Sequence, residues 1–400
     1  MFNAAGHKYE NMKLALYLHF PYCEYKCHYC DFNSYVFEVN DRLEKDYVQA
    51  LKGEWLKIVS QLKPFQLSSL FFGGGTPSLF SASSYQEIFD FLRPCFSEAV
   101  EVSLEANPKS LSEEKIKAYQ TLGVNRFSVG VQSFKEAYLK PLGRLHSAQE
   151  ARQTLGLFEK LQVSSFNIDL MYGFPGQTLE EVEDDLSEAL SFQPEHLSFY
   201  QLTLEEGTRF YKEQQEGKWI LPDPETLADM HQLGEKILGE SAYSHYEISN
   251  YAKNSRYAQH NLAYWNYENY VGLGAGAVSF LNKNCFKEVY PDTELYGLRW
   301  TNPKAPREYQ LKAKEDFSAK KVEQINIETA LKEAWMMGLR LEQGISWKSL
   351  SEKFRQKDLE KSLKNVNKLL QKGWLQQEGE NLFIPSKYRL ITNEIVAEFF

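Results

Sequence analysis

The sequence predicts an α/β fold, because its first half alternates between short β-rich runs and helical patterns. Six such runs recur at intervals of roughly 30 to 50 residues, which is typical of parallel strands joined by crossover helices. Each run ends in a polar or glycine-rich segment. Because barrels and open α/β sheets gather their ligand sites at the C-terminal ends of the strands, these segments are the candidate functional positions.

The predicted strands span residues 14–20, 69–72, 100–104, 125–131, 166–171 and 196–202. Apolar residues at helical spacing predict a helix over residues 42–61. A second helix is expected after Ser112, which is a good N-cap, and ends before Gly123. A third begins after Thr178, where two glutamates in the first turn favour the helix dipole.

Beyond Pro222 the pattern changes. Aromatic residues and glycines dominate residues 243–252 and 264–280 without clear periodicity, and we interpret residues 281–314 as a loop-rich connector. Helices are predicted over residues 328–342, 346–355 and 358–371, followed by a β-hairpin over 375–384 and a last helix from Thr392. Three helices and a hairpin predict a mainly helical, winged-helix-like C-terminal domain. Its nearly balanced charge favours a packing role over DNA binding.

We therefore divide the 400 residues into a flexible N-terminus (1–13), an α/β domain (14–220), an aromatic and glycine-rich extension (221–315) and a C-terminal domain (316–400). The formal net charge of −9 argues against broad nucleic-acid binding. No apolar run approaches membrane-spanning length, and no signal-peptide pattern opens the sequence. The expected location is a reducing cytoplasm, which keeps reactive thiols free.

The cysteines carry the clearest chemical pattern. Cys23, Cys27 and Cys30 form a C-x3-C-x2-C loop directly after the first predicted strand. Three thiolates on one loop can bind one face of a [4Fe–4S] cluster, and the missing fourth ligand leaves one iron open. The sequence thus predicts a cluster that binds a further molecule.

Other readings of the cysteines are less favoured. An odd total of five cysteines and no mark of secretion argue against a disulfide framework. A mixed zinc site that recruits His19 or His28 is the remaining metal alternative. Cys95 and Cys285 stand alone, and we interpret them as small buried hydrophobic residues.

Polar residues at the other strand ends complete a candidate ligand site. The glycines at positions 73–75 let the backbone approach a ligand closely and offer it bare N–H and C=O groups. Glu105 is placed to accept hydrogen bonds from an ammonium or a ribose hydroxyl, and Arg144 to pair with a carboxylate. Each residue alone is more often structural, but consecutive strand ends facing one cysteine loop converge on one site. Gln132 and Asp169 belong to the same set.

The cysteine loop followed by Gly-Gly-Gly-Thr-Pro resembles the radical S-adenosylmethionine (SAM) superfamily. That resemblance implies a partial (β/α)6 barrel in which the open iron chelates the amino and carboxylate groups of SAM, and one electron from the cluster cleaves SAM to a 5′-deoxyadenosyl radical. The segments YLHFPYC, FFGGGTPS, GVNRFSVGVQSF and NIDLMYGFPGQT extend it to the oxygen-independent coproporphyrinogen III oxidase group.

The same resemblance assigns the individual residues. It implies that the three cysteines bind the cluster and that Tyr29 holds the aromatic position between the last two of them. The implied SAM contacts are Tyr17, Gly74, Gly75, Thr76, Glu105, Gln132, Arg144 and Asp169.

Two departures select a subgroup. Oxidases of this group carry a further cysteine where this chain has Phe32, and they have a longer N-terminal extension. Both features, and the segment His-Asn-Leu-Ala-Tyr-Trp at residues 260–265, match HemW-type heme chaperones instead. On the residues alone, a loop histidine with two core aromatics is the favoured interpretation of that segment, and the resemblance reverses this order. The resemblance implies heme contacts from His260, Asn261, Tyr264 and Trp265, with His245 as a second candidate ligand.

The favoured function is a heme chaperone that binds heme, a [4Fe–4S] cluster and SAM, and delivers heme to membrane-bound respiratory hemoproteins, peripherally at the membrane. The alternative is an enzyme, the oxidase that decarboxylates two propionates of coproporphyrinogen III to give protoporphyrinogen IX. A radical methyl transfer that opens the heme ring is a third, less favoured hypothesis. The sequence leaves open whether the protein is a homodimer, whether heme is attached covalently, and whether SAM is turned over.

Overall fold

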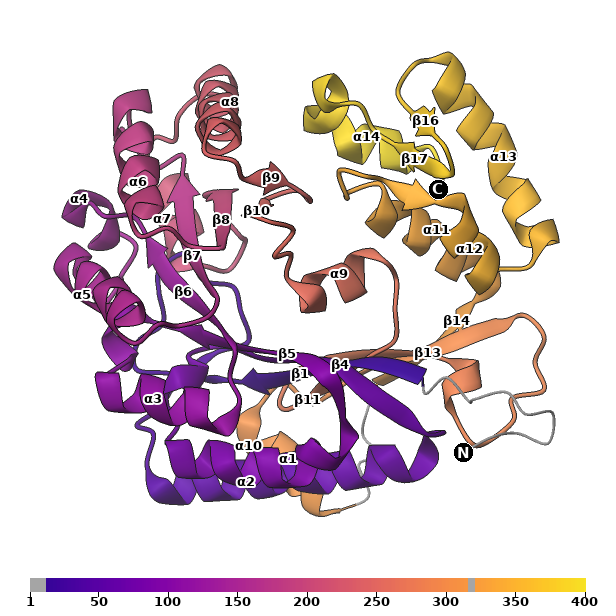
Figure 1. Ribbon diagram of the computed structural model, residues 1–400, viewed down its shortest axis with the longest axis horizontal. Helices are drawn as coiled ribbons and strands as arrows, with labels where there is room; N and C mark the ends of the chain where they lie inside the picture. Colours follow the sequence, from indigo (N-terminus) through magenta and orange to yellow (C-terminus); the bar gives the residue numbers. More distant parts are fainter. Residues whose placement is uncertain (1–11, 316–320) are drawn as a thin grey trace.

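The computed structural model describes residues 12–315 and 321–400. The flexible N-terminus predicted for residues 1–13 lies outside them, except for its last two residues. A single twelve-stranded sheet dominates the described chain (Figure 1). Its central strands are β1 (Met12–Phe20), β4 (Phe65–Gly74), β5 (Phe96–Ala106), β6 (Arg126–Gln132), β7 (Phe166–Tyr172) and β8 (His196–Gln201).

These six strands are adjacent in chain order, and every neighbouring pair is parallel. Helices connect them and cover the outer face of the sheet (Figure 1). The main ones are α1 (Asp41–Gln61), α2 (Ala82–Leu92), α3 (Glu113–Leu122), α5 (Ala148–Lys160) and α6 (Leu179–Ser191). Ser112 caps α3, and Thr178 forms a capping box with Glu181 at the start of α6. The predicted α/β fold and its six parallel strands are confirmed.

The sheet continues beyond both edges of this parallel core. On one side β11 (Tyr270–Leu273) pairs with β1 in parallel, and β12 (Val278–Asn282), β13 (Leu295–Thr301) and β14 (Lys321–Asn326) follow in antiparallel order. On the other side β10 (Asn250–Ala252) pairs with β8, and β9 (Ser244–His245) pairs with β10.

The loop-rich connector predicted for residues 281–314 is therefore wrong over much of its length. It contains β13 and helix α10 (Pro306–Lys314). Gly297 breaks the apolar pattern of β13, and its place in the sheet requires it: a Cβ there would lie 2.5 Å from the Leu281 carbonyl oxygen. Pairing with β12 and β14, rather than local propensity, specifies this strand.

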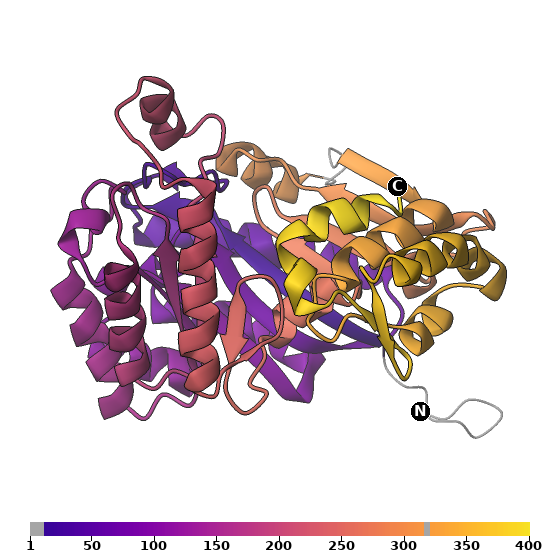
Figure 2. The same cartoon turned by 90° about the horizontal axis from the view of Figure 1, so that it is seen from above.

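The C-terminal domain is mainly helical and contains a small three-stranded sheet, as predicted for a winged-helix-like unit. Its elements are α11 (Ile327–Gly338), β15 (Ile345–Ser346), α12 (Trp347–Lys353), α13 (Gln356–Gln371), β16 (Gln376–Glu378), β17 (Asn381–Phe383) and α14 (Thr392–Ala397). It lies against one side of the barrel (Figure 2). No helix among the described residues is long and apolar enough to cross a membrane.

Two apolar cores reflect this arrangement. The larger one fills the space between the barrel sheet and its helices. The smaller one combines residues of the C-terminal domain, such as Trp335, with Tyr267, Phe280 and Tyr296 from the extended sheet. Because β14 pairs with β13, the large sheet also crosses the boundary that we place at residue 316. The division into domains stays a prediction.

Candidate functional site

The cysteine loop opens onto a cavity at the C-terminal ends of the barrel strands. Cys23 lies on the short strand β2 (Tyr22–Cys23), and the chain passes Cys27 and Cys30 before returning in β3 (Tyr35–Val36), which pairs with β2. All three cysteines line one cavity of about 510 Å³, which we call the cysteine cavity. Their thiols are free of disulfides.

Two polar side chains donate hydrogen bonds to the sulfurs of this loop. The Thr76 hydroxyl lies 3.5 Å from Cys23 Sγ, and Arg144 Nη1 lies 3.7 Å from Cys27 Sγ, so both donate hydrogen bonds to sulfur. Burial raises the pKa of the Cys23 and Cys30 thiols. Thiolates at these positions therefore need a cationic partner, which the iron of a cluster would supply.

The structure does not favour the zinc alternative. A mixed Cys/His site would need a free ring nitrogen on His19 or His28. His19 accepts from the Tyr17 hydroxyl at Nδ1 (2.9 Å) and donates to the Asn33 carbonyl from Nε2 (2.8 Å). His28 is bonded at both ring nitrogens as well, to the Pro141 carbonyl and to Tyr25. Neither imidazole ring therefore has a free nitrogen that could bind zinc.

The glycine loop after β4 packs where no larger residue fits. Gly74 has φ +114°, and a Cβ there would lie 2.6 Å from the His19 ring. A Cβ on Gly75 would lie 2.7 Å from the Tyr22 carbonyl oxygen and 2.9 Å from Cys23 Sγ. The backbone thus runs close beside the cysteine loop, and this cradle suits a ligand that binds main-chain groups next to the cluster.

Acidic residues of β5 and β7, the two strands on either side of β6, line the cavity. Glu105, at the end of β5, accepts a hydrogen bond from the Gly74 N–H at 3.0 Å, and burial raises its pKa to about 8. Asp169 of β7 accepts from Asn167 Nδ2 at 2.7 Å, and burial raises its pKa too. Two half-buried acids that form no ion pair among the described residues suit a ligand that carries an ammonium group and hydroxyls.

A half-buried arginine lines the same cavity. Arg144 donates to the Gly130 carbonyl and to Cys27, but its Nε has no hydrogen-bond partner. An orphaned guanidinium donor in a cavity suits a carboxylate. Nearby Gln132 has φ +71° and accepts a 2.6 Å hydrogen bond from the Tyr200 hydroxyl. The amino-acid end of SAM, with an ammonium and a carboxylate, therefore fits the residues present.

The strand-end residues predicted from the sequence are thus brought together, with one exception. Tyr29 lines the cysteine cavity, whereas Tyr17 does not. The Tyr17 ring packs on Phe71 and near His260 instead, and its hydroxyl holds His19. Sequence reasoning missed further lining residues, although serine at an inward position of an apolar strand was an available signal. They are Ser128, Met171, Ser198, Tyr200, Ser249 and Asn250.

The His-Asn-Leu-Ala-Tyr-Trp segment forms helix α9 (Gln259–Trp265), and its histidine is buried. His260 Nδ1 shares a 2.9 Å hydrogen bond with the Ser69 hydroxyl, and Nε2 shares another of 2.9 Å with the Tyr264 hydroxyl. Burial lowers its pKa to about 3. Both ring nitrogens are thus held by hydroxyl groups in this structure. The heme contact that we expect from His260 stays a prediction.

The rest of the segment faces a second cavity. Asn261, Tyr264 and Trp265 line a space of about 790 Å³ between α9, the extended sheet and α11, which we call the interdomain cavity. Its volume lies within the usual range of ligand sites, about 300–1,000 Å³. Ser249 and Asn250 line both cavities, so the two are neighbours.

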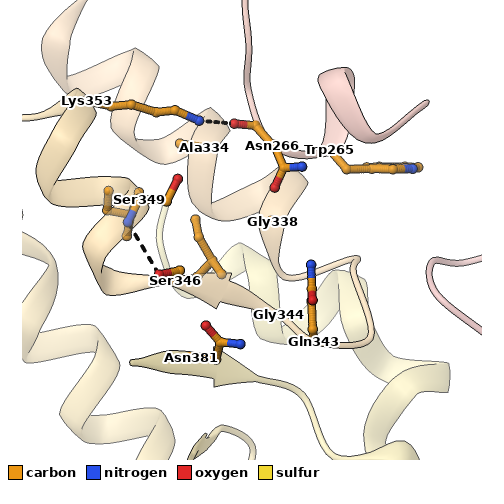
Figure 3. Close-up of a pocket in the computed structure, with 12 residues that line it drawn as sticks. Trp265, Asn266, Ala334, Gly338, Gln343, Gly344, Ser346, Ser349, Lys353 and Asn381 are labelled. Carbon is orange, nitrogen blue, oxygen red and sulfur yellow. Dashed lines mark hydrogen bonds between the residues drawn. The ribbon is translucent and has the colours of Figure 1, made fainter. Parts of the chain in front are cut away.

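Trp265 also borders a smaller pocket of about 220 Å³, under the C-terminal domain (Figure 3). There Lys353 of α12 donates a hydrogen bond to the Asn266 carbonyl, just after α9 (Figure 3). This contact joins the C-terminal domain to the segment. His245, the second histidine candidate, lies outside the residues that line these cavities; Arg389 and Glu235 contact its Nδ1 at 2.8 and 3.2 Å.

Comparison with known proteins places this geometry in a family. The radical SAM superfamily model matches residues 17–189, and the HemN C-terminal domain model matches residues 326–390. The heme chaperone HemW of Escherichia coli (strain K12) is 41% identical over 297 residues, which are 74% of this chain and 75% of that protein. HemW of Bacillus subtilis (strain 168) is 33% identical over 389 residues, covering 96% and 98%.

Among solved structures, coproporphyrinogen III oxidase (HemN) from Escherichia coli, a radical SAM enzyme, matches with a TM-score of 0.77. The match covers 98% of this chain and 91% of that one, at 21% identity. It shows that the two chains share a fold, including the C-terminal domain.

Proposed function

The chain belongs to the HemW family of heme chaperones in the radical SAM superfamily, and from this premise we propose that it binds heme and passes it to hemoproteins. The observation that carries the proposal is the pairing of two neighbouring cavities of different chemistry. The cysteine cavity is lined by three thiols, by Glu105 and Asp169 and by Arg144, while the interdomain cavity has several aromatic side chains in its wall.

In the cysteine cavity, Cys23, Cys27 and Cys30 would hold a [4Fe–4S] cluster, which when bound supplies an open iron for SAM and one electron for its cleavage. The protein's own part is to bind and orient SAM. Arg144 is placed to receive the carboxylate, and Glu105 and Asp169 the ammonium and ribose hydroxyls. The cluster and SAM thus lie beside the heme site and are placed to regulate the binding or transfer of heme.

In the interdomain cavity, Tyr264 and Trp265 offer flat apolar surfaces that suit a porphyrin face. The heme recipients in this proposal are membrane-bound hemoproteins of respiration, reached from the cytoplasm. A chaperone must also release its cargo, and a cavity assembled from two parts of the chain can open without unfolding either part.

The test combines binding, transfer and turnover. Anaerobically reconstituted protein is titrated with hemin, with and without the cluster, and then mixed with membrane vesicles that contain an apo-hemoprotein. We expect saturable hemin binding and heme transfer. The same protein is incubated with coproporphyrinogen III, SAM and a reductant. Formation of protoporphyrinogen IX would reject a chaperone-only function, and Phe32 in place of a further cysteine leads us to expect none.

A further inference from the structure

The interdomain cavity contains one arginine that no acid neutralises. Arg340 lies just after α11, is half-buried, and lines the cavity. It donates to the Met336 carbonyl and, at 3.0 Å, to Asn393 Oδ1. Among the described residues it forms no ion pair. A guanidinium has five N–H donors, so several of them are available to a ligand.

The other arginine of this cavity is paired with acids, and burial shifts the pKa of two further acids. Arg299 is paired with Glu333 and, at 3.3 Å, with Glu323. Glu247 and Glu268 also line the cavity, and burial raises the pKa of both. For Arg340, burial acts in the opposite sense and lowers the pKa, with no acid to offset it. The unpaired positive charge of the cavity is therefore that of Arg340.

The walls around this charge are apolar and adaptable. Tyr264, Trp265, Tyr270 and Phe280 line the side formed by α9 and the sheet, and Met336 and Met337 line the side formed by α11. Aromatic rings stack on flat conjugated ligands, and methionine side chains adjust to irregular shapes. A flat apolar ligand with an anionic edge matches this combination of walls and charge.

We propose that Arg340 binds a propionate of heme seated between α9 and α11, so that the C-terminal domain forms one wall of the heme site. The inference rests on the proposed function and deepens it, because it names the group that orients the ligand. Arginine binds carboxylates with two parallel hydrogen bonds, which fix direction as well as position. Heme carries both propionates on one edge, so that edge faces Arg340.

The experiment compares hemin with hemin dimethyl ester, whose propionates carry no charge. Both are titrated into the cluster-loaded full chain and into its Arg340→Ala and Arg340→Lys variants. We expect Arg340→Ala to weaken hemin binding roughly 10- to 100-fold and to leave ester binding unchanged, with Arg340→Lys in between. Arg389→Ala is the matched control, because Arg389 is also half-buried in the C-terminal domain but does not line the cavity.

The outcomes separate this inference from the proposed function. If the unaltered protein binds neither hemin nor its ester, the chaperone function itself fails. If it binds hemin and Arg340→Ala binds hemin equally well, the propionate assignment fails and the function stands. If Arg340→Ala weakens hemin and ester to the same extent, Arg340 only supports the fold of the domain, which also overturns the assignment. Thermal unfolding of each variant confirms that the compared proteins are folded.

Discussion

The cysteine cavity and the interdomain cavity adjoin each other, but different kinds of structure build them. The first is formed by the ends of successive parallel strands and by one loop, so its residues come from a continuous stretch of about half the chain. The second needs α9, the extended sheet and α11, which meet only when the C-terminal domain packs against the barrel.

The chemistry differs in the same way. Half-buried acids and an arginine whose Nε lacks a hydrogen-bond partner among the described residues line the cysteine cavity. Such groups are costly unless a ligand of opposite charge pairs with them. Aromatic and methionine side chains form a large part of the interdomain cavity wall, and such a wall adapts to a bulky ligand. A firmly held cofactor suits the first cavity, and a cargo that must leave suits the second.

The largest difference between the two cavities is expected when a cluster ligand is removed. Cys30→Ala removes one of three thiolates, so we expect anaerobic reconstitution to lose most of the four-iron signal. Hemin binding by the cluster-free protein should not change, because Cys30 does not line the interdomain cavity. Iron analysis and hemin titration measure the two effects. Cys95→Ala is the control, since Cys95 is also partly exposed and lies outside both cavities. A full iron complement in Cys30→Ala would contradict the ligand assignment.

A smaller effect, again confined to one cavity, is expected for Asp169→Ala. Removing a hydrogen-bonded charged group costs about 1.5–3 kcal/mol, which is roughly 10- to 100-fold in SAM affinity. Equilibrium dialysis on cluster-loaded protein measures this loss. Asp185→Ala is matched, because Asp185 is a buried acid that accepts from Ser133 and the Phe134 N–H outside the cavity. Unchanged SAM affinity in Asp169→Ala would make this acid a structural partner of Asn167.

The pH dependence of SAM binding should follow Glu105. Its pKa is raised from 4.5 to about 8, so between these values the folded protein keeps a proton that the unfolded chain releases. The contribution of this group to stability therefore falls as the pH rises through that window. The carboxylate that an ammonium needs forms only as the pH approaches 8, so SAM affinity should rise roughly 25-fold from about pH 6.5 to 8.5. Glu105→Gln should flatten the profile; an equally steep one would assign it to another group.

The contrast between the cavities also explains why the residues of the cysteine cavity could be predicted from the sequence. Alternation of strands and helices specified the parallel core, and strand ends share one edge of a sheet, so Glu105 and Asp169 were expected to meet before their contacts were known. The cysteine spacing and the glycine loop lie within single turns, where local sequence determines geometry.

The interdomain residues carry no such local pattern. Arg340 and Met336 occupy ordinary positions at the end of a helix, and only the packing of that helix against α9 gives them a shared cavity. β13 was missed for the same reason, since its partners lie elsewhere in the chain. His260 also depends on distant parts of the chain, because the sequence indicates neither its burial nor its hydrogen bond to Ser69.

The smallest effect on the spectrum of the hemin complex is expected for His260, in the conspicuous segment at residues 260–265. His260→Ala should leave the Soret band of the hemin complex unchanged, because both ring nitrogens are held by the Ser69 and Tyr264 hydroxyls. It should lower the free energy of unfolding by about 1–3 kcal/mol, since those buried hydroxyls lose their partners. His146→Ala is the control, as His146 is also buried but is bonded to the Val131 carbonyl outside the interdomain cavity. A Soret shift in His260→Ala but not in His146→Ala would mean that heme binding frees the His260 ring to reach iron, and the interdomain cavity would then be remodelled by its ligand.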